Sequence, residues 1–213
     1  MNGPRRSVHQ QDALAWLAGN PLPEPAGLLL SLPDAVEFRH RDTGRWRTWF
    51  VDAAAAVLRA GAPSRGVVFF QTDVVRDGVW IDKAHLVLIA AESVSATLRW
   101  RKIVCRAPAG TATGGRPGYA HLLAFAADAD AVAAPHRGAD VLPGLGAMAW
   151  NRAMGRAAAE VAVGWLAARG ARTLVAPFCG TGTALAVANA NGLDAIGIEL
   201  HAGRAAAARS QRC

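Results

Sequence analysis

Two glycines and one glutamate near the C-terminus have the spacing of a nucleoside-binding site. An apolar run at residues 173–176 predicts a buried strand, and it leads into Gly180 and Gly182 just before a helical segment. Glycine lets the backbone turn tightly and approach a ligand without a Cβ clash. Glu199 ends the next predicted strand, 17 residues after Gly182, where its carboxylate can accept hydrogen bonds from both hydroxyls of a ribose. Because ligands of open α/β sheets bind at the carboxyl ends of the strands, these residues predict a nucleoside ligand.

The residues that follow the glycines disfavour two common kinds of nucleotide site. A dinucleotide-binding loop would place a third glycine at position 185, where this chain has Leu185. A phosphate-binding P-loop would need Gly-Lys-Ser or Gly-Lys-Thr, which this segment lacks. An adenosine ligand without a pyrophosphate fits the segment better.

The segment 176–183, Ala-Pro-Phe-Cys-Gly-Thr-Gly-Thr, resembles the DPFxGxGT cofactor motif of the amino-group DNA methyltransferases and related RNA methyltransferases. Residues 197–200 are similar to the ribose-binding strand of that family. The resemblance implies a Rossmann-like sheet and S-adenosylmethionine as the cofactor. One departure is Ala176, where the family has an acid. The cofactor-binding residues that the resemblance assigns are Asp12, Ala176, Pro177, Phe178, Gly180, Gly182, Thr183, Glu199 and Leu200.

The order of these motifs is permuted, because the cofactor motif lies near the C-terminus instead of at the start of the fold. Residues 8–13 resemble the family segment whose acid contacts the adenine amino group, which assigns that role to Asp12. Capping of the helix that follows is the other interpretation of Asp12, and both roles can hold together. We expect a single domain with a catalytic half at 1–128, a linker or loop at 129–149 and a cofactor-binding half at 150–213.

The tetrapeptide Ser31, Leu32, Pro33 and Asp34 lies where the resemblance places the DPPY or SPPY catalytic motif. It keeps the first polar residue and the second proline, but it has Leu32 instead of the first proline and Asp34 instead of the aromatic residue. Asp34 could act as a general base toward a ring nitrogen or a hydroxyl, or it could cap the next segment. Asp73 follows the neighbouring predicted strand and is a second candidate carboxylate at the same edge of the sheet.

The aromatic residue that should stack on the methyl acceptor must come from another part of the chain. The candidates are Trp46, Trp80, Trp100 and Tyr119, and packing in the core or hairpin is the alternative for each. Residues 99–103 and 115–121 resemble a later hairpin of the family, around a glycine-rich loop at 110–118. Lys102, Arg106 and Arg116 could bind phosphates there, or could form a solvated hairpin face.

Strand and helix patterns alternate along the chain, so the elements that position these residues should form one sheet covered on both faces. We expect a Rossmann-like α/β fold with a mostly parallel, doubly wound sheet and an antiparallel hairpin. Predicted strands lie at 7–10, 27–30, 67–70, 97–106, 121–125, 173–176 and 195–198. Predicted helices lie at 13–18, 46–60, 83–91, 151–169, 183–191 and 202–210.

Composition limits the class of protein. The chain has 213 residues, 52% of them hydrophobic, and no apolar run that could span a bilayer, so we expect a cytoplasmic protein without membrane contact. Cys105, Cys179 and Cys213 form neither a disulfide framework nor a zinc motif, and we expect no metal. The net charge of +7 favours a nucleic-acid partner, although an arginine-rich, alanine-rich composition can also reflect genome bias.

Three hypotheses follow for the function. The first is an S-adenosylmethionine-dependent methyltransferase that modifies a nitrogen of a nucleic-acid base, with RNA slightly favoured over DNA because little sequence remains for a target-recognition segment. The second is a methyltransferase of a small molecule or protein, which the missing aromatic residue supports. The third is a non-catalytic protein that binds a nucleoside or RNA. The sequence does not indicate the oligomeric state.

Overall fold

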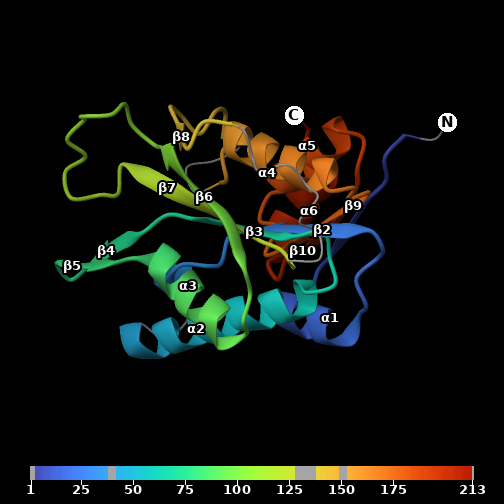
Figure 1. Cartoon of the computed structure of the whole chain (residues 1–213), viewed down its shortest axis with the longest axis horizontal. Helices are drawn as coiled ribbons and strands as arrows, with labels where there is room; N and C mark the ends of the chain where they lie inside the picture. Colours follow the sequence, from blue (N-terminus) through green and yellow to red (C-terminus); the bar gives the residue numbers. More distant parts are fainter. Residues whose placement is uncertain (1–2, 38–41, 128–137, 149–152, 213) are drawn as a thin grey trace.

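The computed structural model describes residues 3–37, 42–127, 138–148 and 153–212, in which strands and helices alternate (Figure 1). The main sheet consists of β1 (Arg6–His9), β2 (Ala26–Leu30), β3 (Val67–Gln71), β6 (Leu98–Cys105), β7 (Tyr119–Phe125), β8 (Val141–Leu142), β9 (Thr173–Pro177) and β10 (Asp194–Ile198). The helices are α1 (Ala13–Gly19), α2 (Thr43–Gly61), α3 (Lys83–Ser93), α4 (Arg156–Ala168), α5 (Thr183–Ala190) and α6 (Ala202–Ser210), with a short 3-10 turn at Ala35–Glu37. A separate hairpin is formed by β4 (Val74–Arg76) and β5 (Val79–Ile81).

The strand order of the main sheet is β1-β10-β9-β2-β3-β7-β6-β8. The strands from β1 to β3 in this order run parallel to one another. Strand β7 is antiparallel to both β3 and β6, and β8 lies parallel to β6. This topology confirms the predicted mostly parallel α/β sheet with an antiparallel hairpin.

Each face of the sheet is covered by a layer of helices (Figure 1). Leu28 and Leu30 of β2 pack on the face covered by α1, α2 and α3, whereas Leu29 packs on the face covered by α4, α5 and α6. Both sets of side chains are apolar because a parallel strand in this position is buried on both sides. The continuous apolar runs that predicted these strands have this origin.

The N-terminal and C-terminal halves of the chain meet in the centre of the sheet. Strand β9, from the C-terminal part, lies between β10 and β2, with Leu28 opposite Val175. The carboxyl ends of β2 and β9 are therefore neighbours, although the cofactor-like loop and residues 31–34 are far apart in sequence. Despite the permuted order of the motifs, the predicted cofactor segment and the predicted catalytic segment therefore lie at one edge of the sheet.

Two local predictions need correction, and one element was not predicted. The helix expected at 151–169 begins only at Arg156, while residues 149–152 lie outside the described part of the chain. Gly155 precedes it because the carbonyl of Leu145 passes so close that a Cβ would clash. The expected linker contains the short strand β8, and the chain after Asp73 forms the β4–β5 hairpin. Strands this short have too few residues to show a period.

Asp77 and Gly78 form the turn between β4 and β5. Both residues have positive φ angles, 50° and 76°, as a tight hairpin turn between two twisted strands requires. Within the described ranges, the structure contains no helix that combines the length and hydropathy needed to cross a membrane.

Candidate functional site

The loop between β9 and α5 has the backbone that its glycines predict. Phe178, Gly180 and Gly182 have φ angles of 57°, 57° and 90°. A Cβ added to Gly180 would meet no atom within 4 Å, whereas one added to Gly182 would lie 2.8 Å from the Cα atom of Ala208 in α6. Gly180 therefore keeps an open side on the loop. Gly182 is required for the close packing of α6, and not only for approach to a ligand as the sequence analysis expected.

Glu199 connects this loop to the end of β10. Its side chain is 7% exposed, and its two oxygens accept hydrogen bonds from the backbone N–H of Gly180 at 3.0 Å and of His201 at 2.8 Å. A carboxylate offers about four acceptor positions, so each oxygen retains capacity for a further donor. The position beside Gly180 is the one expected of a ribose-binding carboxylate. Leu200, the next residue, is 68% exposed at the same edge.

Asp12 lies at this edge because β1 pairs with β10. The backbone N–H of Gln11 donates to the carbonyl of Glu199 at 3.2 Å, which places the start of α1 beside the end of β10. The Asp12 carboxylate accepts from the backbone N–H of Ala15 at 2.8 Å and caps α1. The capping role is thus observed, and an adenine contact stays a prediction.

The remaining residues of the predicted cofactor segment separate into buried and loop positions. Ala176 and Pro177 are buried strand residues, and Ala176 packs on the face of α4, α5 and α6. Phe178 meets Trp49 of α2 edge to face, with ring centroids 6.4 Å apart. The hydroxyls of Thr181 and Thr183 are buried without a hydrogen-bond partner among the described residues. Buried hydroxyls usually have a hydrogen-bond partner, so these two at the start of α5 have capacity for one.

Cys179 is a packing residue. Its backbone N–H donates to the carbonyl of Ile198 at 3.0 Å, and its sulfur lies against Gly197, where an added Cβ would come within 2.8 Å of Sγ. Burial, with the charge of Glu199, raises the pKa of the thiol to about 12. The thiol therefore stays protonated at neutral pH, which disfavours a cysteine nucleophile in this loop.

Residues 31–34 follow β2 at the neighbouring strand end. Leu32 is 2% exposed and belongs to the core, and the carbonyl of Pro33 accepts from the indole N–H of Trp46 at 3.3 Å. The Asp34 carboxylate accepts a hydrogen bond from the ε-ammonium of Lys83, the first residue of α3. Asp34 is thus one half of an ion pair, and its backbone carbonyl also receives the N–H of Glu37 at 2.9 Å.

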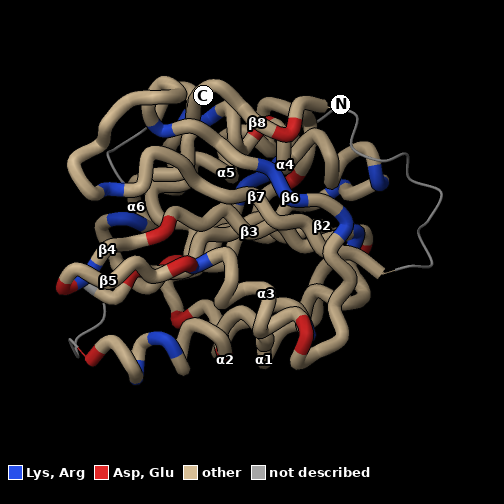
Figure 2. Tube along the Cα trace, turned by 60° about the vertical axis from the view of Figure 1, so that its left-hand side comes forward, with Lys and Arg blue, Asp and Glu red and all other residues tan. Residues whose placement is uncertain are grey.

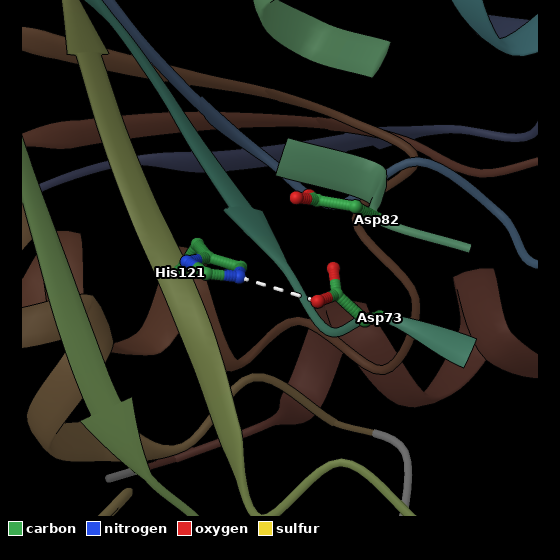
Figure 3. A group of neighbouring side chains, drawn as sticks. All are labelled: Asp73, Asp82 and His121. Atoms are coloured by element: carbon green, nitrogen blue, oxygen red, sulfur yellow. Dashed lines mark hydrogen bonds and ion pairs between the residues drawn. The ribbon is translucent and has the colours of Figure 1, made fainter. Parts of the chain in front are cut away.

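Asp73 is the second carboxylate at this edge, as predicted, but it is buried, 3% exposed, and lies beside His121 (Figure 3). It accepts from the backbone N–H of Lys83 at 2.9 Å and from the indole N–H of Trp80 at 3.1 Å, and it lies 3.5 Å from Nε2 of His121. Burial acts to raise the pKa of Asp73, but hydrogen bonds from His121, Lys83 and Trp80 outweigh it and lower the pKa below its usual value. The Asp73 carboxylate therefore fixes the positions of Trp80, Lys83 and His121 by hydrogen bonds.

The ring of His121 has one tautomer in this arrangement. Nη2 of Arg101 lies 3.1 Å from Nδ1 of His121, and a guanidinium can only donate. Nδ1 is therefore the acceptor and Nε2 carries the proton, directed at Asp73 (Figure 3). Asp73, Asp82 and His121 have possible metal ligand atoms within 4.8 Å of one another. The protonated Nε2 has no lone pair for a metal, so the geometry favours a hydrogen-bond network.

Of the expected phosphate-binding side chains, Lys102 needs correction. It is 1% exposed, and its ammonium donates to the carbonyls of Gly138 and Ala139 at 3.0 and 2.9 Å and to Asp140 at 3.1 Å. Lys102 thus secures the segment before β8 and is not available to a phosphate. Its position follows from strand alternation, because Val104 points to the same face.

The other residues predicted around the hairpin remain near the edge. Arg106 donates to the hydroxyl of Thr72 at 3.3 Å, next to Asp73, and Arg116 lies exposed in the loop before β7. Tyr119 is half-buried and meets His121 edge to face at 5.2 Å. Lys83 and Arg101 also lie at this edge, and neither was predicted from the sequence. Lys83 could have been suspected, because a lysine directly after a helix-capping aspartate is poorly placed unless an acid faces it.

Lys and Arg lie on many elements, with Asp and Glu among them, in the described part of the chain drawn in Figure 2. The net charge of +7 therefore does not by itself locate an interface. The hydrogen bond from Arg106 to Thr72 shows directly that this cation lies at the same edge of the sheet as Asp73.

No protein-family model matches the chain, and no curated protein sequence matches it. Solved structures do match, and they show that the fold is that of amino-group DNA methyltransferases. The PvuII DNA methyltransferase, which is cytosine-N4-specific, aligns with a TM-score of 0.73 and 14% identity over 99% of this chain and 88% of its own. TTHA0409 of Thermus thermophilus, a candidate DNA modification methylase in complex with S-adenosyl-L-methionine, gives 0.69 and 17% over 96% and 92%. M1.HpyAVI in complex with S-adenosylmethionine gives 0.62 and 13% over 96% and 98%. The predicted resemblance in fold is confirmed.

Proposed function

We propose that this protein is an S-adenosylmethionine-dependent methyltransferase that methylates a nitrogen of a nucleic-acid base. The observation that supports it most is the contact of Glu199 with Gly180, at the strand end beside residues 31–34. Glu199 and Gly180 would face the nucleoside of the cofactor, and residues 31–34 at the neighbouring strand end would face the methyl acceptor. Among solved proteins of the same fold, TTHA0409 and M1.HpyAVI are in complex with S-adenosylmethionine, and the PvuII enzyme is a DNA methyltransferase by name.

The residues around the loop fit this cofactor. Glu199 retains acceptor capacity for ribose hydroxyls, Gly180 keeps an open side, and the hydroxyls of Thr181 and Thr183 need polar partners. Asp12 and Leu200, at the ends of neighbouring segments, would border the adenine. When bound, the cofactor supplies a sulfonium methyl group that needs little further activation.

On the acceptor side, residues 31–34 would position the nitrogen. Placing a nitrogen in line with an activated methyl group is most of the catalysis that such a reaction requires. Asp34 would receive the proton that the nitrogen loses, because it is a carboxylate at this strand end and its side chain is partly exposed. Ser31, half-buried at the end of β2, would accept a hydrogen bond from the acceptor.

Calorimetry and labelled methyl transfer test the proposal. Purified protein should bind S-adenosylmethionine and S-adenosylhomocysteine, and it should transfer tritiated methyl groups to bulk RNA or bulk DNA. Labelling of one nucleic acid and not the other would identify the acceptor class. No binding at millimolar concentration would overturn the cofactor assignment, and labelling of only a small-molecule extract would overturn the acceptor.

A small-molecule acceptor is the second candidate, and one observation favours it. The position that would hold a stacking aromatic residue is occupied by the Asp34–Lys83 ion pair, which suits a polar or charged acceptor. The small-molecule extract in the same labelling experiment tests this candidate directly.

A further inference from the structure

Trp80 differs from the other aromatic residues proposed for stacking because it is exposed to solvent. It is 47% exposed, whereas Trp46 is fully buried beneath residues 31–34. Trp100 packs edge to face against another tryptophan on the α4 side of the sheet, with ring centroids 5.5 Å apart. Tyr119 is half-buried with its ring against a histidine. Trp80 is therefore the most accessible to a ligand of the four aromatic candidates.

One edge of the Trp80 ring is fixed. Its indole N–H donates to Oδ2 of Asp73 at 3.1 Å, and Oδ1 of Asp73 accepts the backbone N–H of Lys83 at 2.9 Å. The side chain of Lys83 in turn reaches Asp34. This chain of contacts ties Trp80 to the tetrapeptide after β2. A ring already held by its edge loses little freedom when a planar ligand stacks on its face.

The surroundings of Trp80 suit a nucleic-acid base. Trp80 lies opposite Val75 in the β4–β5 hairpin, which projects from the end of β3 beside α3 (Figure 1), and Val75 is 40% exposed. The guanidinium of Arg106 donates to the hydroxyl of Thr72, the residue before the Asp73 that binds the indole N–H. Exposed aromatic rings and cations along one edge are the combination that proteins use to hold unpaired bases and their phosphates.

We propose that the acceptor base stacks on Trp80, which supplies the aromatic surface that position 34 lacks. The inference rests on the proposed function and specifies how the acceptor is held. Asp34 is then free to remain polar in its ion pair with Lys83, because stacking and proton acceptance are divided between two residues. The acceptor must be unpaired or extruded from a duplex to reach the indole.

Substitutions at position 80 test this assignment against a matched control on the same hairpin. Trp80→Phe keeps an aromatic face without the N–H, Trp80→Leu keeps an apolar side chain without a π face, and Val79→Ala changes an exposed neighbour. Each is compared with wild type for the KM of single-stranded oligonucleotides in labelled methyl transfer, for oligonucleotide binding by fluorescence anisotropy, and for S-adenosylmethionine binding by calorimetry.

Loss of one stacked base should weaken oligonucleotide binding by Trp80→Leu about 5- to 150-fold and raise the KM in parallel. Trp80→Phe should stay within a few-fold of wild type, and Val79→Ala should match it. Affinity for S-adenosylmethionine should stay unchanged throughout. Equal oligonucleotide binding by Trp80→Leu and Val79→Ala would overturn the stacking role while wild-type transfer still supports the function. An absence of transfer by the wild type to any nucleic acid would instead overturn the proposed function itself.

Discussion

The carboxylate of Asp34 accepts a hydrogen bond from the ammonium of Lys83, a residue whose side chain is almost completely buried. The two partners are unequally enclosed, because the Asp34 side chain is 30% exposed and that of Lys83 only 3%. Lys83 also stands at the first position of α3, where the helix dipole disfavours a cation. If the ion pair is broken, water can solvate the Asp34 side chain far better than that of Lys83.

This asymmetry predicts different costs for the two single substitutions. Asp34→Ala leaves a buried ammonium without its partner and should lower the free energy of unfolding by about 3–5 kcal/mol. Lys83→Met leaves a carboxylate that water can solvate and should cost about 1 kcal/mol or less. The double variant Asp34→Ala with Lys83→Met should be more stable than Asp34→Ala alone. Urea unfolding monitored by circular dichroism measures all three, and equal losses in the two single variants would contradict the prediction.

Asp73 should make stability depend on pH in the acid range. Its pKa is lowered in the folded protein, so below about pH 4 the unfolded chain binds more protons and the native state loses stability. The stabilisation is present above the ordinary carboxyl pKa and is lost as the pH falls through the lower, folded value. Asp73→Asn should therefore cost about 1–3 kcal/mol at pH 7, and the difference from wild type should shrink below pH 4.

Urea unfolding of wild type and Asp73→Asn across pH 2.5–7, a range chosen to span the ordinary carboxyl pKa of about 3.9, measures this effect. The control is Asp77→Asn on the same hairpin, because the Asp77 side chain is 92% exposed and asparagine tolerates its positive φ. A constant difference between Asp73→Asn and wild type at every pH would exclude a titrating carboxylate as its cause.

The sheet could be predicted because its central strands are buried on both faces. Apolar runs in β2, β3 and β9 have no other stable place in a globular chain, and the glycines after β9 indicate the turn. Glu199 was predictable for the same reason, since it ends a strand adjacent to that turn.

The contacts of the acceptor side could not be predicted because they depend on which strands are neighbours. The ion pair of Asp34 with Lys83 joins residues 49 positions apart, and it requires that β2 and β3 lie side by side with α3 above them. The burial of Lys102 did leave a signal, because it shares the alternation of Trp100 and Val104 along β6. Arg99 and Arg101 alternate with these residues along β6 and obscured the pattern.

Gln71 should be a site where stability and activity conflict. Its side chain is fully buried at the carboxyl end of β3, and neither its oxygen nor its nitrogen has a hydrogen-bond partner among the described residues. Gln71 is paired across the strands with His121, so it belongs to the same edge as Asp73. Gln71→Met, which keeps the volume without the amide, should raise the free energy of unfolding by about 1–3 kcal/mol.

The same Met variant should transfer methyl groups more slowly, because Gln71 is paired across the strands with His121 and its replacement changes the packing around the His121–Asp73 contact at this edge. Urea unfolding and labelled transfer on the same preparation measure both effects, with Gln10→Met as an exposed control that should shift stability by less than about 0.5 kcal/mol. A less stable Gln71→Met variant would show that the amide is hydrogen-bonded in solution.

Glu199 should set the affinity for the cofactor. Its carboxylate is fixed by the backbone N–H groups of Gly180 and His201, so both the ribose contact and the shape of the loop depend on it. Glu199→Ala removes charge-assisted hydrogen bonds worth about 1.5–3 kcal/mol, which corresponds to about 10- to 150-fold weaker binding of S-adenosylmethionine. Glu199→Gln keeps one acceptor oxygen and should fall between Glu199→Ala and wild type. Calorimetry measures these affinities, and Glu160→Gln is the matched control, because Glu160 is a half-exposed acid on α4 that pairs with Arg156 one helical turn away. An unchanged affinity in Glu199→Ala would remove the ribose assignment and leave Glu199 as a residue that only shapes the loop.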